Sequence, residues 1–249
     1  MWLEAYDDPR FVPIVFGTTA ISMGAFASFA APMTWIAARD PESLRRFRIQ
    51  SRKPREQRLV RASIARWLSN NLVLLAIVVA AWPLLALSQL RLDEAPSIAV
   101  GALQVIAFIY VDDFLYYGVH RAMHAPFLYR HVHSIHHKIL TPWAVTGHYM
   151  HPVEFVVTGA LALLPATLVG AHVHVLWAWV VWRQWEATEG HSGYDFPWSP
   201  SRLFPGSDGA RHHDAHHARV KGNYAGFFAY VDGVFGTFAK GYARGRPLE

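Results

Sequence analysis

Uncharged, mainly apolar runs divide the chain into long blocks. Four such runs cover residues 11–38, 67–90, 95–111 and 155–182. Because a helix of about 20 apolar residues crosses a bilayer, the first two runs predict transmembrane helices. The third run is short, and we expect its helix to continue through Asp112 and the apolar residues that follow. Four runs in so short a chain indicate a membrane protein rather than a large soluble core.

The fourth run admits two arrangements. One straight helix would be about 42 Å long, and a single crossing would separate the histidines that precede it from those that follow it. Pro165 and Gly170 interrupt its middle, where both residue types disfavour a continuous helix. We therefore predict a re-entrant hairpin that returns the chain to the face it left. His172 and His174 would lie near its tip and serve the turn rather than a metal.

A basic segment between the first two runs predicts the topology. Three acidic residues oppose ten basic ones there, which are Arg39, Arg45, Arg46, Arg48, Arg52, Lys53, Arg55, Arg58, Arg61 and Arg66. Such loops stay in the cytoplasm, so we expect the N-terminus outside and residues 112–154 on the cytoplasmic side. The position of this segment between membrane runs also argues against a nucleic-acid partner. Residues 1–10 carry three carboxylates and one arginine, which does not predict a cleaved signal peptide.

Histidine is the residue that stands out in the composition. The chain has 15 histidines, all between His120 and His217. It has no cysteine, which excludes thiolate-ligated haem, Cys-ligated iron–sulfur clusters and disulfide scaffolds. Eight of the histidines form three boxes, which are His120 and His124, then His133, His136 and His137, then His213, His216 and His217. On a helix, spacings of three and four residues place side chains on one face, so we expect His133 to share a face with both later members of its box.

The boxes predict a site for two metal ions. Imidazole is the commonest metal ligand in proteins, and eight ligands are more than one metal takes. The chain lacks the His-Glu-x-x-His pattern of hydrolytic zinc sites and the Glu-x-x-His pairs of soluble di-iron proteins. An all-nitrogen pair of metals beside membrane helices therefore favours non-haem iron that activates oxygen. A pH sensor would also use histidines but would not need this repeated spacing.

Further segments follow a pattern known from one enzyme superfamily. They are 47–50 (FRIQ), 148–154 (HYMHPVE), 191–198 (HSGYDFPW), 222–225 (GNYA) and 232–237 (DGVFGT). Together with the boxes, these segments resemble the fatty acid hydroxylase superfamily, the membrane di-iron oxygenases that include sterol desaturases and C4-methyl sterol oxidases. The segment 191–198 is similar to one found in the sterol oxidases.

The resemblance implies a set of metal ligands. They are the eight box histidines, His191, and His151 as a tenth. The additional histidines His131, His148 and His212 would support the ligands or be exposed. Metal-bound imidazoles usually donate their other N–H to a carboxylate or carbonyl, and the polar candidates near the boxes are Asp112, Asp113, Glu154, Asp214 and Asn223. Each of these five could instead cap a helix or face solvent.

We thus expect an all-α fold in a single membrane-embedded domain, 1–249. Residues 1–111 would form membrane hairpins and the basic loop, and residues 112–240 would form the metal-binding region with the hairpin 155–182. About four spans or half-spans would carry a cytoplasmic, histidine-rich helical cap.

The resemblance also implies an oxidoreductase with two iron ions, which oxidises an unactivated C–H bond of a lipid with O2. A sterol-like lipid that enters from the bilayer is expected, and zinc could replace iron on expression. Since no dinucleotide or P-loop pattern occurs, electrons would come from a ferredoxin- or cytochrome b5-type protein, which the basic segment could dock. The alternatives are a carotenoid hydroxylase or ketolase, and a membrane zinc-binding or transport protein. The boxes lie outside the apolar runs, which counts against transport.

Overall fold

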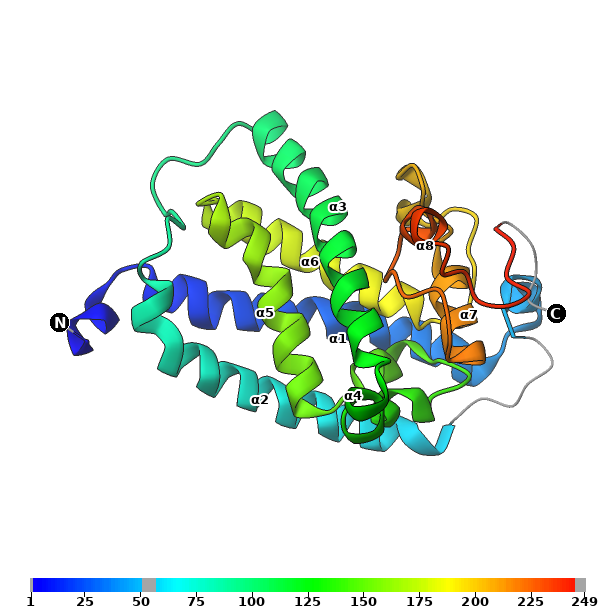
Figure 1. The fold of residues 1–249 in the computed structure, drawn as a ribbon. Helices are drawn as coiled ribbons and strands as arrows, with labels where there is room; N and C mark the ends of the chain where they lie inside the picture. Colours follow the sequence, from blue (N-terminus) through cyan, green and yellow to red (C-terminus); the bar gives the residue numbers. More distant parts are fainter. Residues whose placement is uncertain (1, 51–56, 245–249) are drawn as a thin grey trace.

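The protein is mainly helical in the part of the chain that the structure describes. A computed structural model describes residues 2–50 and 57–244, so Arg52, Lys53 and Arg55 of the basic segment lie outside the described residues. The helices are α1 (Thr18–Arg39), α2 (Val60–Leu85), α3 (Ile98–Met123), α4 (Pro126–His131), α5 (Pro152–Leu168), α6 (Val173–Gly190), α7 (Ala210–Arg219) and α8 (Ala229–Phe235). Turns and short 3₁₀ helices connect them (Figure 1). The predicted all-α fold is confirmed.

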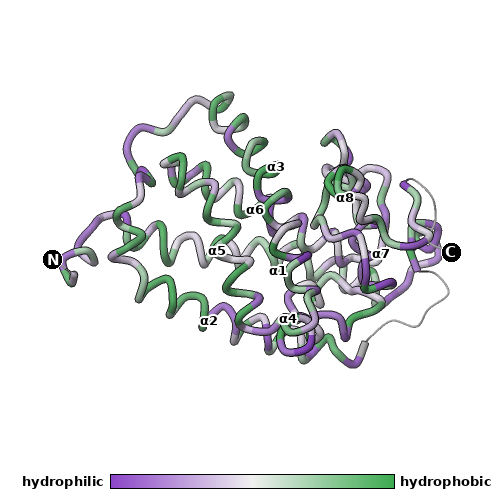
Figure 2. The backbone as a smooth tube through the Cα atoms, in the orientation of Figure 1, coloured by the Kyte–Doolittle hydropathy of each residue, from purple (hydrophilic) through white to green (hydrophobic). Residues whose placement is uncertain are grey.

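Within residues 2–50 and 57–244, three helices are long and apolar enough to cross a membrane. Two of them are α2 and α3. The third is the helix Val12–Arg39, which consists of α1 and the π-helical turn that precedes it. Between 22% and 28% of their most apolar windows is buried within the protein. Exposed apolar side chains such as Leu72 and Leu103 cover their outer faces, and Figure 2 shows the hydrophobic stretches along these helices. Lipid is the environment that suits such faces, and the protein is an integral membrane protein.

The fourth run forms the predicted hairpin, with α5 and α6 as its arms. The chain turns at Gly170, whose φ is +61° and where a Cβ would meet the Gln89 carbonyl oxygen at 2.8 Å. Glycine is therefore required at this turn. Pro165, which we expected to share in the break, lies inside α5, because the helix continues to Leu168 before it ends. The Trp179 indole N–H bonds the Ala162 carbonyl at 2.7 Å and joins the two arms.

Helix α6 lies at the centre of the bundle. It packs along α1 and also contacts α3 and α5. Ile109, Leu176, Trp179 and Phe228 are almost completely buried in the core that surrounds it. Because α6 ends at Gly190, directly before His191, its position in the bundle fixes the place of that histidine.

The basic segment between α1 and α2 packs against the histidine-bearing part of the chain. The Asp195 N–H bonds the Phe47 carbonyl at 2.8 Å, and the Ile49 N–H bonds the Gly193 carbonyl at 3.1 Å. The Gln50 side chain donates to Asp214 of α7 at 2.6 Å. The C-terminal end of α1 and helix α7 thus lie at the same end of the molecule (Figure 1).

Candidate metal centre

Nine histidines converge into two adjacent groups, which we name site A and site B. Site A consists of His120, His124, His133, His137 and His216. Site B consists of His136, His191, His213 and His217. Within each site, the ligand atoms lie within 4.8 Å of one another. The two sites are neighbours, since the ring centroids of His137 and His217 are 5.2 Å apart.

The structure divides each three-histidine box between the two sites. His133 and His137 belong to site A, whereas His136 belongs to site B. The expectation that His133 shares a face with both is therefore wrong. Its box forms a 3₁₀ helix, His133–Lys138, directly after the chain breaks from α4 at Val132. Short connections of this kind often take 3₁₀ geometry, which does not keep the side-chain directions of an α-helix.

The third box is also divided, but its first and last histidines lie in site B and its middle one in site A. His213 and His217 lie one turn apart on α7 and both belong to site B, whereas His216 belongs to site A. The single first box stays together, because His120 on α3 and His124 at its C-cap both belong to site A. Helix α7 therefore stands between the two sites and contributes to each.

Site A is built around His133. The Nε2 atom of His133 lies 3.1 Å from Nε2 of His120, 3.1 Å from Nε2 of His124 and 3.0 Å from Nε2 of His137. Nε2 of His216 lies 3.0 Å from that of His137. With metal–nitrogen bonds of about 2.1 Å, two ligands at a right angle would be about 3.0 Å apart. The donor set of site A therefore fits one shared metal ion.

Site B is built around His191 in the same way. Its Nε2 atom lies 3.3 Å from Nε2 of His136, 3.1 Å from that of His213 and 3.0 Å from that of His217. Gly147 packs directly against this ring, and a Cβ there would meet Nδ1 of His191 at 2.9 Å. Four convergent nitrogens at these spacings also fit a metal ion.

Fixed acceptors behind the rings decide which ring nitrogen faces each site. Nδ1 lies 2.7–2.8 Å from an acceptor in five pairs, which are His120 with Tyr224 O, His133 with Glu154 Oε1, His191 with Ala187 O, His216 with Gly222 O and His217 with Ile139 O. A carbonyl oxygen can only accept, so Nδ1 must carry the proton in the four backbone pairs. The lone pair of Nε2 then faces the site, as a metal ligand requires.

Burial keeps the histidines of both sites neutral. Desolvation lowers the pKa of His133 to about 2 and the pKa values of His124 and His191 to about 4. It also lowers the pKa values of His136, His213, His216 and His217 well below the usual value. Burial disfavours the charged imidazolium, and only the neutral ring binds a metal. The sites are thus prepared for cations at physiological pH.

Among the polar residues expected behind the ligands, Glu154 contacts a site histidine through its bond to His133. The others hold different groups. Asp113 accepts from the backbone of Phe227 and Phe228, Asp112 pairs with Arg183, Asp214 accepts from Gln50, and Asn223 bonds the backbone of His212 and Ala239. Asp113 and Asn223 thus hold backbone near the sites, whereas Asp112 and Asp214 pair with side chains of other elements.

The remaining predicted histidines lie outside both sites. His151 caps α5, with Nδ1 accepting from the Val153 N–H at 3.2 Å, so the geometry does not bring it to a metal position. His131 is exposed on α4. Buried His148 stacks on Phe26, with ring centroids 4.0 Å apart. His212 contacts Asp232 at 3.1 Å. At the hairpin turn, His172 caps α6, as its predicted position near the tip implies.

Comparison with known proteins identifies this arrangement. The family model described as fatty acid hydroxylase matches residues 105–237, which contain all nine histidines of the two sites. The chain belongs to the fatty acid hydroxylase family. No solved structure matches it.

Two kinds of curated protein are similar to this fatty acid hydroxylase family member. It is 43% identical over 157 residues to the very-long-chain aldehyde decarbonylase GL1-8 of Oryza sativa subsp. indica, which covers 62% of this chain and 58% of the relative. It is 37% identical over 179 residues to methylsterol monooxygenase 2-2 of Arabidopsis thaliana, which covers 70% of this chain and 67% of the relative. The aligned part thus spans little more than half of the rice protein.

Asp232 is a positioning residue behind site A that was not singled out from the sequence. Its buried carboxylate accepts from the backbone N–H groups of Tyr224 and Ala225, each at 2.8 Å, and from the Thr237 hydroxyl at 2.6 Å. It thereby fixes Tyr224, whose carbonyl orients His120. The available signal was its place at the start of the 232–237 segment.

A cavity leads from the centre of the bundle to site B. It encloses about 150 Å³ between α1, α2, α3, α5 and α6, and His191 and His213 form part of its wall. Apolar side chains such as Leu74, Phe155 and Val180 supply much of the remaining wall. The cavity therefore connects an apolar interior with the candidate metal position.

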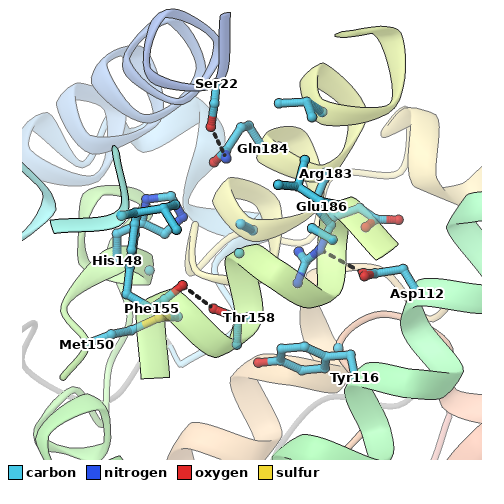
Figure 3. A pocket seen from close by; sticks show the side chains of 18 of the residues that line it. Ser22, Asp112, Tyr116, His148, Met150, Phe155, Thr158, Arg183, Gln184 and Glu186 are labelled. Carbon is cyan, nitrogen blue, oxygen red and sulfur yellow. Dashed lines mark hydrogen bonds and ion pairs between the residues drawn. The ribbon is translucent and has the colours of Figure 1, made fainter. Parts of the chain in front are cut away.

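One wall of the cavity carries ionisable groups, and its Arg183 and Glu186 were not among the residues singled out from the sequence. Arg183 pairs with Asp112 at 2.9 Å and lies over the Tyr116 ring at 5.3 Å, and Glu186 lies one turn further along α6 (Figure 3). Gln184 bonds Ser22 of α1 at 2.8 Å. Charged groups are expensive inside a membrane protein and are usually functional. The signal for Arg183 was a charge directly after a long apolar run.

Proposed function

We propose that the protein is a di-iron oxygenase that hydroxylates or further oxidises an unactivated C–H bond of a neutral, sterol-like lipid. The five histidines of site A would together hold one iron ion, and the four histidines of site B would hold a second one. Bound iron would supply the reductive activation of O2 that the C–H bond requires. The histidines keep their Nε2 lone pairs directed at the ions, and the apolar walls exclude water from the reacting carbon.

The observation that carries this proposal is the cavity that ends at His191 and His213. Site B has one nitrogen donor fewer than site A and is the site that the cavity reaches. A lipid in this cavity would present its reacting carbon to site B. The enclosed 150 Å³ is below the roughly 300–1,000 Å³ of typical ligand pockets. We infer that it holds the reacting end of the lipid, with the remainder between the helices.

The charged wall favours an uncharged substrate with an oxygen function. Among the residues that the structure describes, the carboxyl groups of Asp112, Asp113 and Glu186 line the cavity together with one arginine, Arg183. A fatty acid carboxylate would have to lose its hydration at a wall where Asp112 already pairs with Arg183. An uncharged hydroxyl or carbonyl group could accept from the Arg183 guanidinium without bringing a second anion to it. The methylsterol monooxygenases among the relatives support a sterol-like lipid.

A second candidate is action on a very-long-chain aldehyde. Its support is the 43% identity to the rice aldehyde decarbonylase and the carbonyl oxygen that Arg183 could bind. A carotenoid hydroxylase or ketolase, the enzymatic alternative from the sequence, remains a further outcome of the experiment below.

We further propose that both sites face the cytoplasm. The basic segment packs on the part of the chain that carries them, and basic loops stay cytoplasmic. The electrons would then come from a cytoplasmic ferredoxin- or cytochrome b5-type protein.

The test is turnover by the purified, iron-loaded chain with a reduced ferredoxin and O2. A 4-methyl sterol, a very-long-chain aldehyde, β-carotene and a free fatty acid are offered separately, and the products are identified by mass spectrometry with labelled O2. We expect labelled oxygen in the 4-methyl sterol. Oxidation of the fatty acid but not of the sterol would overturn the neutral-lipid proposal. Consumption of the aldehyde, with the other three lipids unchanged, would favour the second candidate.

The variant Arg183→Lys tests the oxygen-binding role in the same assay. Lysine keeps the charge but loses the planar fork of donors. We expect the KM for the sterol to rise about tenfold, the worth of one hydrogen bond to a charged group. The matched control is the same sterol without its hydroxyl group, whose KM should not change. An equal rise for both lipids would mean that Arg183 serves the fold only.

A further inference from the structure

A hollow on the surface lies directly behind site A. Its volume is about 770 Å³. It lies between the end of α7 and the segment that follows α8, and its lining residues are Arg219, Lys221, Gly222, Tyr224, Thr237, Phe238, Lys240 and Gly241. The hollow is separate from the lipid cavity, which approaches the histidines from site B.

The rim of this hollow is positively charged. Arg219, Lys221 and Lys240 are exposed, and no carboxylate lines the hollow among the residues that the structure describes. The carboxylate of Asp232 is close in sequence, but it is completely buried and accepts hydrogen bonds from the backbone beneath the hollow. Phe238 is 39% exposed and adds an apolar patch beside the cations. Such a surface complements an acidic protein face.

The floor of the hollow touches the ligands of site A. The Gly222 carbonyl accepts from Nδ1 of His216 at 2.7 Å, and the Tyr224 carbonyl accepts from Nδ1 of His120 at 2.7 Å. One layer of backbone therefore separates the surface from two metal-facing imidazoles. The layer is tightly packed, since a Cβ on Gly222, whose φ is +86°, would meet the Ala239 backbone at 2.5 Å.

We propose that this hollow is the docking site of an acidic one-electron carrier protein and that electrons enter at site A. Catalysis needs electrons from outside the chain, so this inference rests on the proposed function. The hollow meets the two requirements of such a site, which are charge complementarity and a short path of covalent and hydrogen bonds to the metal position. It differs from the basic segment between α1 and α2, which the sequence offered as a surface that could dock a carrier but which also serves as a topology signal. The substrate and the carrier would then approach the two metals from different directions.

The first test is a binding measurement on the zinc-loaded full chain, which needs no turnover. The probe is a soluble plant-type ferredoxin, titrated at about 0.01 M and about 0.15 M ionic strength, where the Debye lengths are about 30 and 8 Å. We expect the double variant Lys221→Glu/Lys240→Glu to raise the Kd at the lower ionic strength at least about tenfold and to flatten its salt dependence. The matched control is Arg46→Glu/Arg61→Glu, which changes two exposed cations on the other basic surface by the same charge.

The outcomes separate the docking site from the proposed reaction. An unchanged Kd in Lys221→Glu/Lys240→Glu, an equal loss in the control variant, or no salt-sensitive binding by the unaltered chain would each overturn the docking site. In the iron-loaded enzyme, the double variant should lose turnover with ferredoxin but keep turnover with a small chemical reductant. Failure to oxidise any lipid would overturn the proposed function and leave the binding result standing by itself.

Discussion

The hydrogen bond between Glu154 and His133 gives the sharpest test of the metal sites. Glu154 Oε1 lies 2.7 Å from Nδ1 of His133, the ring whose Nε2 atom has three close neighbours in site A. Glu154 is 1% exposed and His133 is 0% exposed, so water has little access to replace the lost acceptor. The variant Glu154→Ala removes the acceptor, and Glu154→Gln keeps a carbonyl oxygen in its place.

The expected magnitude follows from the role of such acceptors. Loss of a group behind a metal ligand lowers metal affinity about 10- to 100-fold, or about 1.4–2.7 kcal/mol. Because the pair is fully buried, we expect Glu154→Ala near the upper end. We expect Glu154→Gln near the lower end, since the amide oxygen can still accept from Nδ1. Only site A should weaken, because the Glu154 contact is with a histidine of that site.

The assay is chelator competition on the purified chain, with the metal content per chain measured at each step. The unaltered protein should release two ions, and Glu154→Ala should release the first at much lower chelator concentration. Glu186→Gln is the matched control, because that buried carboxylate accepts from the Trp182 indole at 2.8 Å instead. This account of site A would be refuted if Glu154→Ala released both ions at the same chelator concentrations as the unaltered protein. It would also be refuted if the control variant showed the same weakening.

Three further predictions follow from the same geometry. His191→Ala removes the ring at the centre of site B, so metal analysis should find one ion per chain and turnover should cease, while the helical circular dichroism signal persists. Full metal content with normal activity would refute the ligand assignment. Gly147→Ala places a Cβ against Nδ1 of His191, where 2.9 Å is available, so chelator competition should show weaker binding at site B, and an unchanged affinity would mean that the ring can shift freely. Because the chain has no cysteine, single cysteines introduced at Ser88, Ser134 and Ser207 report the topology. A membrane-impermeant thiol reagent added outside intact cells should label position 88 at most, and labelling of position 207 but not of position 134 would exclude a shared cytoplasmic face.

The sequence alone determined the features that depend on local pattern. Long uncharged runs gave the three spanning helices, because hydropathy over about 20 residues is set by composition and needs no knowledge of packing. Pro165 and Gly170 marked the break in the fourth run, because both residue types disfavour a continuous helix; the structure places the turn at Gly170 and keeps Pro165 within α5. The boxes identified eight of the nine histidines that the structure brings together, and the spacing of four residues correctly paired His120 with His124 and His213 with His217, since such residues lie one helical turn apart.

The tertiary structure decided how those histidines are shared and what surrounds them. Whether His136 faces site A or site B depends on a 3₁₀ helix and on where α7 lies, and neither is encoded in the spacing. His151 has a sequence context like that of a ligand, yet its ring serves the first turn of α5. The pairing of Arg183 with Asp112 joins residues of different helices. Such contacts depend on how helices pack, because side-chain directions are fixed only when the element ends and neighbours are in place.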